Sequence, residues 1–266
     1  MEHASPSPVS GARRRVAGEQ KVEEQPRMTA RPRMRALATL LVATACALGA
    51  GFDCAAQPLR PARMADLGAE PASAEVLHVA HWAVDSGDTA GLPFAVVDKI
   101  EGRAYVFGAD GRLRGASAAL VGFARGDRSV PGIGDRPISS IREEERTTPA
   151  GRYEASMGRG MKGEEILWVD YEGAVAIHRV VTGVPRERRL QRLDSKLASD
   201  RRITYGCINV PVKFFENVVL PTFGKAGGIV YVLPETRRAQ DLFGSYEVRQ
   251  GLVEARPGPP DAPRVP

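Results

Sequence analysis

The spacing of apolar residues predicts one short helix followed by a series of strands. Between about Ala74 and Asp85 the apolar residues recur at helical spacing, and Ser73 stands at the position of an N-cap. From Phe94 onward the spacing changes to every second residue, which is typical of strands that bury one face. The expected strands and strand-like segments cover 94–100, 103–107, 113–122, 153–156, 164–171, 173–181 and 228–233. Two more helices are expected over 186–199 and 212–219, so the pattern indicates a mainly β domain with a few short helices.

Glycine and acidic residues mark the turns between these strands. Asp110-Gly111 predicts a tight hairpin turn, because Asp-Gly suits conformations with positive φ. A second hairpin is expected around Glu172-Gly173. The charged stretch 126–145 predicts a long loop, of a length often found at binding sites. The composition agrees, since 28 Gly, 20 Pro and only 6% aromatic residues favour many turns over a helix bundle.

The N-terminal region has the three parts of a secretory signal. Residues 31–35 are basic, residues 36–52 form an apolar run rich in Ala and Leu, and residues 54–56 are small enough for cleavage after Ala56. The expected product is exported to the periplasm or cell envelope, with no membrane span after cleavage. An uncleaved anchor and a lipoprotein attached at Cys46 are the alternatives.

Net charge gives little evidence for a nucleic-acid partner. More than half of the formal charge of +5 falls within residues 1–56, and Met28 and Met34 are alternative starts within this region. No P-loop, dinucleotide fingerprint or internal repeat is present, so no nucleotide cofactor is expected. The expected organisation is an N-terminal extension with signal peptide (1–56), a linker and helix (57–92), a catalytic domain (93–236) and a C-terminal segment with a disordered Pro-rich tail (237–266).

Cleavage would leave one cysteine. Cys46 and Cys54 would depart with the signal, and Cys207 would remain without a partner for an intramolecular disulfide. A lone thiol is a buried inert group, an intermolecular bridge or a reactive group. His78 and His81 are spaced to share a metal ion on the first helix, but no third ligand stands at a recognisable spacing, so no metal site is expected.

Cys207 and His178 are a candidate nucleophile and base. The thiolate is the reactive form of cysteine, and a histidine within hydrogen-bond reach can remove the thiol proton. Gly206 would let the backbone approach a substrate closely, and the N–H groups of Gly206 and Cys207, in a tight strand-to-helix turn, would stabilise an oxyanion. A low pKa is therefore expected for Cys207. A Cys and a His at this separation are common by chance, so spacing alone is weak evidence.

Three motifs, in the same order, resemble the L,D-transpeptidases of the YkuD type. Residues 204–209 (Thr-Tyr-Gly-Cys-Ile-Asn) resemble their Ser/Thr-x-Gly-Cys-hydrophobic-Asn/Arg signature. Ile177-His178 resembles the upstream histidine strand, and residues 148–153 (Thr-Pro-Ala-Gly-Arg-Tyr) resemble the Thr-Pro-x-Gly-x-aromatic segment. Residues 94–122 resemble the opening strands, so the resemblance covers about 94–234.

The resemblance implies a YkuD-like β-sandwich or barrel-like domain that acts on peptidoglycan stem peptides. Such enzymes cleave the bond between the third and fourth residues of a tetrapeptide stem, pass the acyl group to a cysteine and then to an acceptor amine. It implies Cys207 as nucleophile, His178 as base and later acid, and Gly206 with Cys207 as oxyanion donors, without a cofactor. The carbonyl of Arg179 would orient the imidazole. Substrate contacts are expected from the set Tyr205, Asn209, Trp168 and Arg179.

Two departures from the family pattern change the assignment of roles. Tyr205 stands where the family usually has a second histidine, so His178 would act alone. The interval between His178 and Cys207 is also longer than usual, by the arginine-rich stretch 184–202, called the insertion below. The insertion is either a solvated helix face or a lid that binds acidic groups of the stem peptide. In the lid interpretation, neutralising its arginines together would raise KM with little loss of fold; they are Arg186, Arg188, Arg189 and Arg192.

Several roles and function classes stay open at this point. Asn209 holds the cysteine turn or contacts substrate, while Trp168 and Tyr171 line a pocket or pack within their hairpin. The acceptor is a second stem peptide, a wall-linked protein, a D-amino acid or, for an L,D-carboxypeptidase, water. A non-catalytic cell-wall-binding module is the alternative class. A thiol-redox protein is disfavoured because no Cys-x-x-Cys pair is present.

Overall fold

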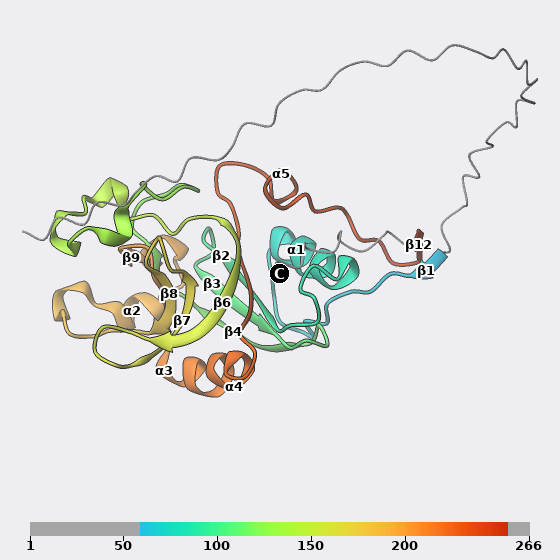
Figure 1. Cartoon of the computed structure of the whole chain (residues 1–266), viewed down its shortest axis with the longest axis horizontal. Helices are drawn as coiled ribbons and strands as arrows, with labels where there is room; N and C mark the ends of the chain where they lie inside the picture. Colours follow the sequence, from blue (N-terminus) through green and yellow to red (C-terminus); the bar gives the residue numbers. More distant parts are fainter. Residues whose placement is uncertain (1–58, 255–266) are drawn as a thin grey trace, which may run out of the picture. The chain divides into compact units, whose positions relative to one another are not determined.

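The protein is described by a computed structural model that covers residues 59–254 (Figure 1). The expected signal segment over 1–56 and the tail over 256–266 lie outside the described residues. Within them, the chain forms an eight-stranded sheet, two small two-stranded sheets and several short helices, which confirms the mainly β class. No helix in this part of the chain is long and apolar enough to cross a membrane.

The large sheet has the strand order β10-β8-β7-β6-β11-β2-β3-β4. Neighbouring strands are antiparallel except for β10 with β8 and β11 with β2, which are parallel. The parallel pairs matter for the site, since a parallel pair needs a long connection that leaves room for extra elements. The strands are β2 (Phe94–Asp98), β3 (Arg103–Phe107), β4 (Leu113–Ala118), β6 (Gly151–Arg159), β7 (Glu165–Asp170), β8 (Val175–Arg179), β10 (Ile208–Val210) and β11 (Gly228–Val232).

The two edge strands of this sheet, β4 and β10, are linked at one point. Leu120, just after β4, exchanges backbone hydrogen bonds of 2.8 and 2.9 Å with Asn209 of β10. Beside this bridge, β5 (Val121–Gly122) pairs in parallel with β9 (Arg202–Thr204). The sheet is therefore nearly closed, in the barrel-like form that was expected, and the strands on either side of Cys207 are both anchored next to the end of β4.

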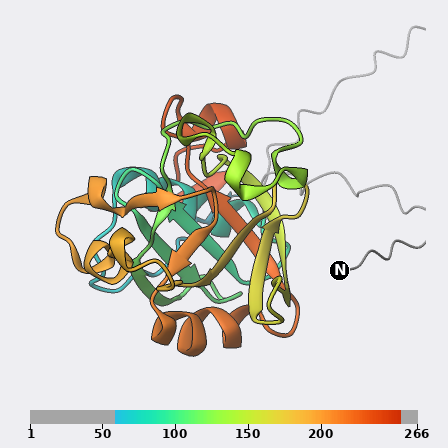
Figure 2. The same ribbon diagram turned by 90° about the vertical axis from the view of Figure 1, so that its left-hand side faces the viewer.

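Alternate strand residues face two different apolar clusters. Val97, Val106, Ile177 and Val230 belong to an inner cluster that also contains Phe215 from the helical segment after β10. That segment consists of α3 (Val212–Phe214), the π-helical η6 (Phe215–Val219) and α4 (Leu220–Phe223), and Figure 2 shows it in orange-red along one side of the strands. The expected helix over 212–219 therefore continues to Phe223.

The first helix, α1 (Ala74–Ser86), covers the opposite face of the central strands. Ser73 is its N-cap and accepts a 3.3 Å hydrogen bond from the Val76 N–H, as the sequence predicts. Gly87 ends the helix with φ of 73°, a conformation that favours glycine. Trp82 packs edge-on against Tyr231 of β11, with ring centroids 5.9 Å apart.

The two ends of the described chain meet beside α1. β1 (Leu59–Pro61) pairs with β12 (Leu252–Glu254), and α5 (Ala239–Phe243) stacks Phe243 against Trp82 at 6.4 Å. Neither the strand pair nor α5 was expected, because each is too short to show a period. The segments before β2 and after β11 thus share an apolar cluster with the central strands.

The insertion does not form the single helix expected over 186–199. It contains η4 (Pro185–Glu187), α2 (Arg189–Asp194) and η5 (Ala198–Arg201). Arg188 separates the first two with φ of 50°, a left-handed conformation that no α-helix continues through. The long loop over 126–145 also holds three short turns: η1 (Ile133–Asp135), η2 (Ile138–Ser140) and η3 (Glu143–Glu145).

Candidate active site

His178 and Asn209 lie side by side on adjacent parallel strands. Asn209 of β10 is in register with His178 of β8, and their neighbours Ile208 and Ile177 are buried in the inner cluster. Because side chains alternate along a strand, His178 and Asn209 project from the other face. Trp168 of β7 pairs with Ala176 and therefore belongs to the same face. The sheet register thus places His178, Asn209 and Trp168, from three strands, on one face.

The cysteine turn joins two strands, β9 and β10. It was expected to lead from a strand into a helix, but α3 begins only after Pro211. Gly206 has φ of 138°, and a Cβ added there would lie 3.0 Å from the Thr147 carbonyl oxygen. The turn therefore requires glycine for both its conformation and its close approach to the neighbouring chain.

The Thr204 hydroxyl makes two hydrogen bonds within this turn. Its Oγ1 accepts a 3.2 Å bond from the Gly206 N–H and donates a 2.6 Å bond to the Cys207 carbonyl oxygen. The Gly206 N–H, which was expected to stabilise an oxyanion, is therefore already engaged with a local side chain. Threonine side chains commonly form such local bonds to the backbone.

Thr148 supports the cysteine turn through a hydrogen bond to Gly206. Its buried hydroxyl accepts a 2.8 Å bond from the Gly122 N–H and donates a 2.7 Å bond to the Gly206 carbonyl oxygen. The Thr148 carbonyl in turn accepts a 3.0 Å bond from the buried ammonium group of Lys99. The Thr-Pro segment noted in the sequence therefore has a structural role here, since it supports the glycine before the thiol.

Replacing Thr148 by valine should lower the stability of the fold. Valine keeps the shape but leaves the Gly122 N–H and the Gly206 carbonyl without a partner in a buried place, and each such group costs about 1–3 kcal/mol. We expect the free energy of unfolding to fall by about 2 kcal/mol or more, measured by urea denaturation. Thr182→Val, at an exposed position, is the matched control and should leave the free energy unchanged; equal values for the two variants would contradict this role.

Cys207 is a free, partly buried thiol. Its Sγ lies 3.5 Å from the Ala174 carbonyl oxygen. Burial raises the pKa of the Cys207 thiol, while the Ala176 N–H and the charge of Arg189 act in the opposite direction. The expected low pKa is therefore wrong for the structure as it stands. The thiol is protonated at neutral pH and needs a base at the moment of attack.

His178 is a neutral imidazole with both nitrogens engaged. Nδ1 lies 2.8 Å from the Arg179 carbonyl oxygen, and Nε2 lies 3.0 Å from Nδ2 of Asn209. Burial lowers the pKa of His178, the Arg179 carbonyl raises it, and the charge of Arg189 lowers it. Among the described residues, neither imidazole nitrogen is hydrogen-bonded to Cys207. The expected contact with the Arg179 carbonyl is present, but the thiol must turn away from Ala174 to reach the imidazole.

The remaining residues expected at the site have different surroundings. Tyr205 is stacked under the guanidinium of Arg146, which lies 4.0 Å from the ring centroid. Trp168 packs edge-on against Tyr171 with centroids 5.1 Å apart, as the hairpin interpretation holds. The Arg179 side chain pairs with Glu216 at 3.2 Å, so only its carbonyl is brought to the imidazole.

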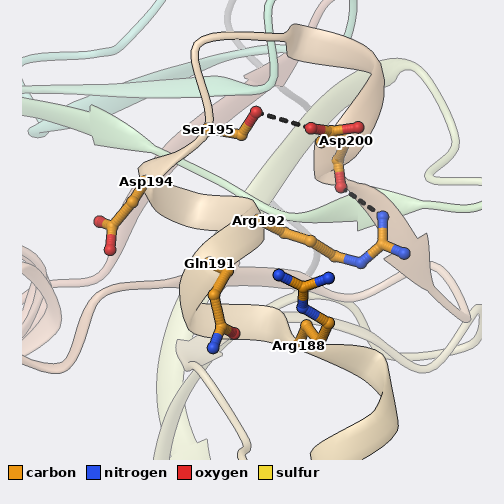
Figure 3. Close-up of a pocket in the computed structure, with 6 residues that line it drawn as sticks. All are labelled: Arg188, Gln191, Arg192, Asp194, Ser195 and Asp200. Atoms are coloured by element: carbon orange, nitrogen blue, oxygen red, sulfur yellow. Dashed lines mark hydrogen bonds between the residues drawn. The ribbon is translucent and has the colours of Figure 1, made fainter.

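The insertion contributes a polar pocket of about 420 Å³ (Figure 3). Arg192 donates 2.8 Å bonds to the carbonyl oxygens of Glu187 and Asp200, so its guanidinium holds the insertion together. In Figure 3 the guanidinium of Arg188 points into the pocket beside that of Arg192. The side chains of Arg186 and Arg188 have no hydrogen-bond or ion-pair partner among the described residues. The pocket is lined by Arg188, Gln191, Arg192, Asp194, Ser195 and Asp200.

Two contacts of the site lie beyond what the sequence pattern signals. Arg189 donates a 2.6 Å hydrogen bond to Oδ1 of Asn209, and Thr148 supports Gly206 as described above. Arg189 is one of many arginines in the insertion, and no pattern separates it from them. Among residues 59–254, no group of three or more His, Cys, Asp or Glu side chains is placed to hold a metal ion.

Comparison with known proteins gives structural similarity at low sequence identity. No protein-family model and no curated protein matches the sequence. The helical cell shape determining protein Pgp2 from Campylobacter jejuni is 18% identical, with a TM-score of 0.36 over 55% of this chain and 49% of that one. An L,D-transpeptidase mutant from Enterococcus faecium is 18% identical, with a TM-score of 0.29 over 53% of this chain and 49% of that one.

An L,D-transpeptidase fragment from Xylanimonas cellulosilytica is 15% identical, with a TM-score of 0.32 over 53% of this chain and 60% of that one. The chain thus spans about half the length of the Pgp2 and Enterococcus structures. Similarity at this level assigns no activity, so a functional proposal must be carried by the residues of the site itself.

Proposed function

We propose that the protein is a cysteine-dependent L,D-transpeptidase that acts on peptidoglycan stem tetrapeptides. The observation that carries the proposal is the arrangement around β8 and β10. A neutral imidazole, oriented by the Arg179 carbonyl, lies on the strand next to the one that follows the thiol of Cys207. The motifs around Cys207, His178 and Thr148 support the same chemistry, because each of the three resembles a segment of this family.

In the proposed reaction, His178 moves the proton and Cys207 carries the acyl group. Nε2 of His178 gives up its hydrogen bond with Asn209 and forms one with the thiol of Cys207. It then accepts the thiol proton while Sγ attacks the carbonyl carbon of the third stem residue. The carbon–nitrogen bond to the fourth residue breaks, and the imidazolium protonates the departing amine. An acceptor amine then attacks the thioester carbon, and His178 takes the proton of that amine. The bond between the carbon and Sγ breaks, and the imidazolium gives its proton to the sulfur, which restores the thiol. The substrate must supply or induce part of the oxyanion site, since the Gly206 N–H is engaged with Thr204.

The products formed from purified muropeptides test this function. Disaccharide tetrapeptides are incubated with the protein and weighed by mass spectrometry. Joined stems with loss of the fourth residue are expected for the transpeptidase, whereas single stems shortened by one residue would show an L,D-carboxypeptidase. Unchanged tetrapeptides that nevertheless bind the protein would overturn the enzymatic proposal in favour of a wall-binding module.

Export to the cell envelope belongs to the same proposal. It rests on the basic segment 31–35, the apolar run 36–52 and the small residues before Gln57. The mature chain is expected to begin near Gln57, with the catalytic part over 93–236. Mass spectrometry of the protein recovered from cells measures its N-terminus, and a cytoplasmic chain that retains residues 36–56 would contradict export.

Two arginines of the insertion are proposed to bind a carboxylate of the donor peptide. Arg189 and Arg192 make internal bonds, so neutralising all four arginines would disturb the insertion itself. Arg186→Gln combined with Arg188→Gln removes only guanidinium groups without a partner in the described structure. We expect KM to rise roughly tenfold, since a hydrogen bond to a charged group contributes about 1.5–3 kcal/mol.

The measurement is steady-state kinetics on the muropeptide substrate, with thermal unfolding as the check on folding. Lys196→Gln, which removes one exposed positive charge from the same insertion, is the control and should leave KM unchanged. Unaltered kinetics in the double variant would leave these arginines as part of a solvated face.

A further inference from the structure

We infer that Arg189 is a positioning residue that holds His178 in the tautomer of a base, acting through the side-chain amide of Asn209. The role of His178 as a base rests on the proposed function. The position of its imidazole proton does not, because it is a property of the folded chain. The residue comes from the insertion, which the resemblance to a known family leaves without a role.

The contacts form a continuous line of hydrogen bonds. The Glu187 carboxylate accepts a 2.6 Å bond from Nε of Arg189, and Nη1 of Arg189 donates a 2.6 Å bond to Oδ1 of Asn209. Nδ2 of Asn209 lies 3.0 Å from Nε2 of His178, and Nδ1 of His178 lies 2.8 Å from the Arg179 carbonyl. Asn209 is only 1% exposed, so water does not compete for its amide.

The donor and acceptor at each of these hydrogen bonds follow from the chemistry of the groups. A guanidinium can only donate, so the Asn209 atom that faces Arg189 is the amide oxygen. The amide nitrogen then faces His178 and donates, which makes Nε2 an acceptor. The single proton of the neutral imidazole is therefore on Nδ1, where the Arg179 carbonyl accepts it. Nε2 keeps the lone pair that a base needs.

Without Arg189 the amide loses the group that selects its orientation. A half-turn of the Asn209 side chain would present Oδ1 to Nε2. Oδ1 would then compete with the Arg179 carbonyl for the single imidazole proton and draw part of the population to the tautomer with the proton on Nε2. That tautomer is a hydrogen-bond donor and cannot accept the thiol proton. Arg189 thus excludes the unproductive arrangement, although it does not itself reach Cys207 or His178 through a hydrogen bond.

The charge of Arg189 acts in the same sense as its geometry. It lowers the pKa of His178, after burial, and so helps to keep the imidazole neutral. It also lowers the pKa of Cys207 against the larger opposing effect of burial. The other charged group that influences His178 is Glu164, which raises its pKa. A cation on the insertion therefore favours both the free base and the thiolate.

The position of Arg189 depends on the folding of the insertion around it. Its side chain is 13% exposed, and that of its partner Glu187 is 23% exposed. Arg188, directly before it, has the left-handed conformation that ends η4 and starts α2. Arg192 fixes the same turn through the Glu187 carbonyl at 2.8 Å. The insertion is thus built to present this guanidinium to β10.

The tautomer of His178 is the direct test, measured on the full chain with ¹⁵N-labelled histidine. Long-range ¹H–¹⁵N spectra distinguish a proton on Nδ1 from one on Nε2, and His178→Ala assigns the signal. We expect the wild type to carry the proton on Nδ1 and Arg189→Gln to show a large fraction on Nε2. Arg189→Lys, which can also only donate, should restore much of the wild-type signal.

A second variant separates positioning from simple loss of structure. Asn209→Asp places a group that only accepts against Nε2, so it should move the proton to Nε2 and raise the pKa of His178. The charge-matched control for Arg189→Gln is Lys196→Gln, which should change neither the proton position nor the pKa of His178. Thermal unfolding of each variant shows that the tautomer is read from a folded protein.

Kinetics connect the tautomer to the reaction. Arg189→Gln should lower kcat on muropeptides at least tenfold with little change in KM, whereas Arg189→Lys should recover most of it. A folded Arg189→Gln protein that keeps the proton on Nδ1 would overturn the inference. If the wild type shows no turnover at all, the proposed function fails, while the tautomer result still decides the role of Arg189.

Discussion

Replacing Cys207 by serine should abolish turnover of muropeptides while the fold stays intact. A serine hydroxyl is far less ionised than a thiol and a weaker nucleophile, so one neutral histidine is not enough to activate it in this site. We expect kcat to fall by about a thousandfold or more, because loss of a nucleophile removes the acyl-enzyme route altogether. The side chain is nearly the same size, so the turn around Gly206 should be undisturbed.

The covalent intermediate gives a second measurement of the same change. A carbapenem, chosen because the sequence resembles an acyl-transfer family, should add one drug mass to the wild type and none to Cys207→Ser. Thermal unfolding is the control for folding. The catalytic role would be wrong if the serine variant retained full activity, or if the wild-type thiol resisted alkylation in the folded protein. In that event the wall-binding module becomes the better description.

The sequence predicts the central fold well because its local signals agree with burial. Residues of β2 and β3 alternate between the two apolar clusters, as the two faces of a strand do. Both faces of these strands are buried, however, whereas the sequence pattern predicted one buried face. The first helix begins at the predicted cap, Ser73. The Asp110-Gly111 turn forms with Gly111 at φ of 77°, as a hairpin of this kind requires.

The helix expected over 186–199 shows where periodicity misleads. Leu190, Leu193 and Leu197 have helical spacing, but only Leu193 is buried, at 6% exposure. Leu190 and Leu197 are 52% and 64% exposed, so they do not form one packed face. An apolar stripe predicts a helix only when a partner surface covers it, and the sequence does not reveal that surface.

The candidate site was predicted by residue type more than by geometry. Cys207, His178 and Asn209 were all singled out, but their contacts depend on the parallel pairing of β8 with β10. The engaged Gly206 N–H depends on the hydroxyl of Thr204, and the orientation of Asn209 depends on Arg189. The strand pairing and the Arg189 contact join segments that are distant along the chain, so spacing does not encode them. The Thr204 contact is local, but it forms only in the turn that the two folded strands define.

Replacing His178 by alanine should slow the reaction of the thiol by about 10²–10⁴-fold at neutral pH, the usual cost of removing a general base. The structure explains why the loss should be large. Burial holds the pKa of Cys207 above its ordinary value of 9.0, so almost no thiolate forms without help. Burial also holds the pKa of His178 below its ordinary value of 6.5, so the imidazole is in its basic form throughout the neutral range.

The rate of thiol alkylation should depend on pH differently in the wild type and in His178→Ala. In the wild type, the rate of thiol alkylation should fall only as the pH drops through the lowered pKa of His178, where the base becomes protonated. In His178→Ala the rate should instead keep rising with pH until the thiol ionises by itself, at a pH above 9.0. The difference between the two proteins should therefore be largest near pH 7 and should narrow in alkaline solution.

Alkylation by iodoacetamide between pH 5 and 10 measures both profiles, and muropeptide turnover at neutral pH checks them against catalysis. Tyr205→Phe is the matched control, since phenylalanine keeps the ring that stacks under Arg146 and removes only the hydroxyl. Tyr205 replaces the second histidine of the family pattern and has no assigned proton transfer, so its loss should cost much less. Superimposable pH profiles for His178→Ala and the wild type would show that the thiol reacts without this imidazole, and the base would then have to be sought elsewhere on the same face of the sheet.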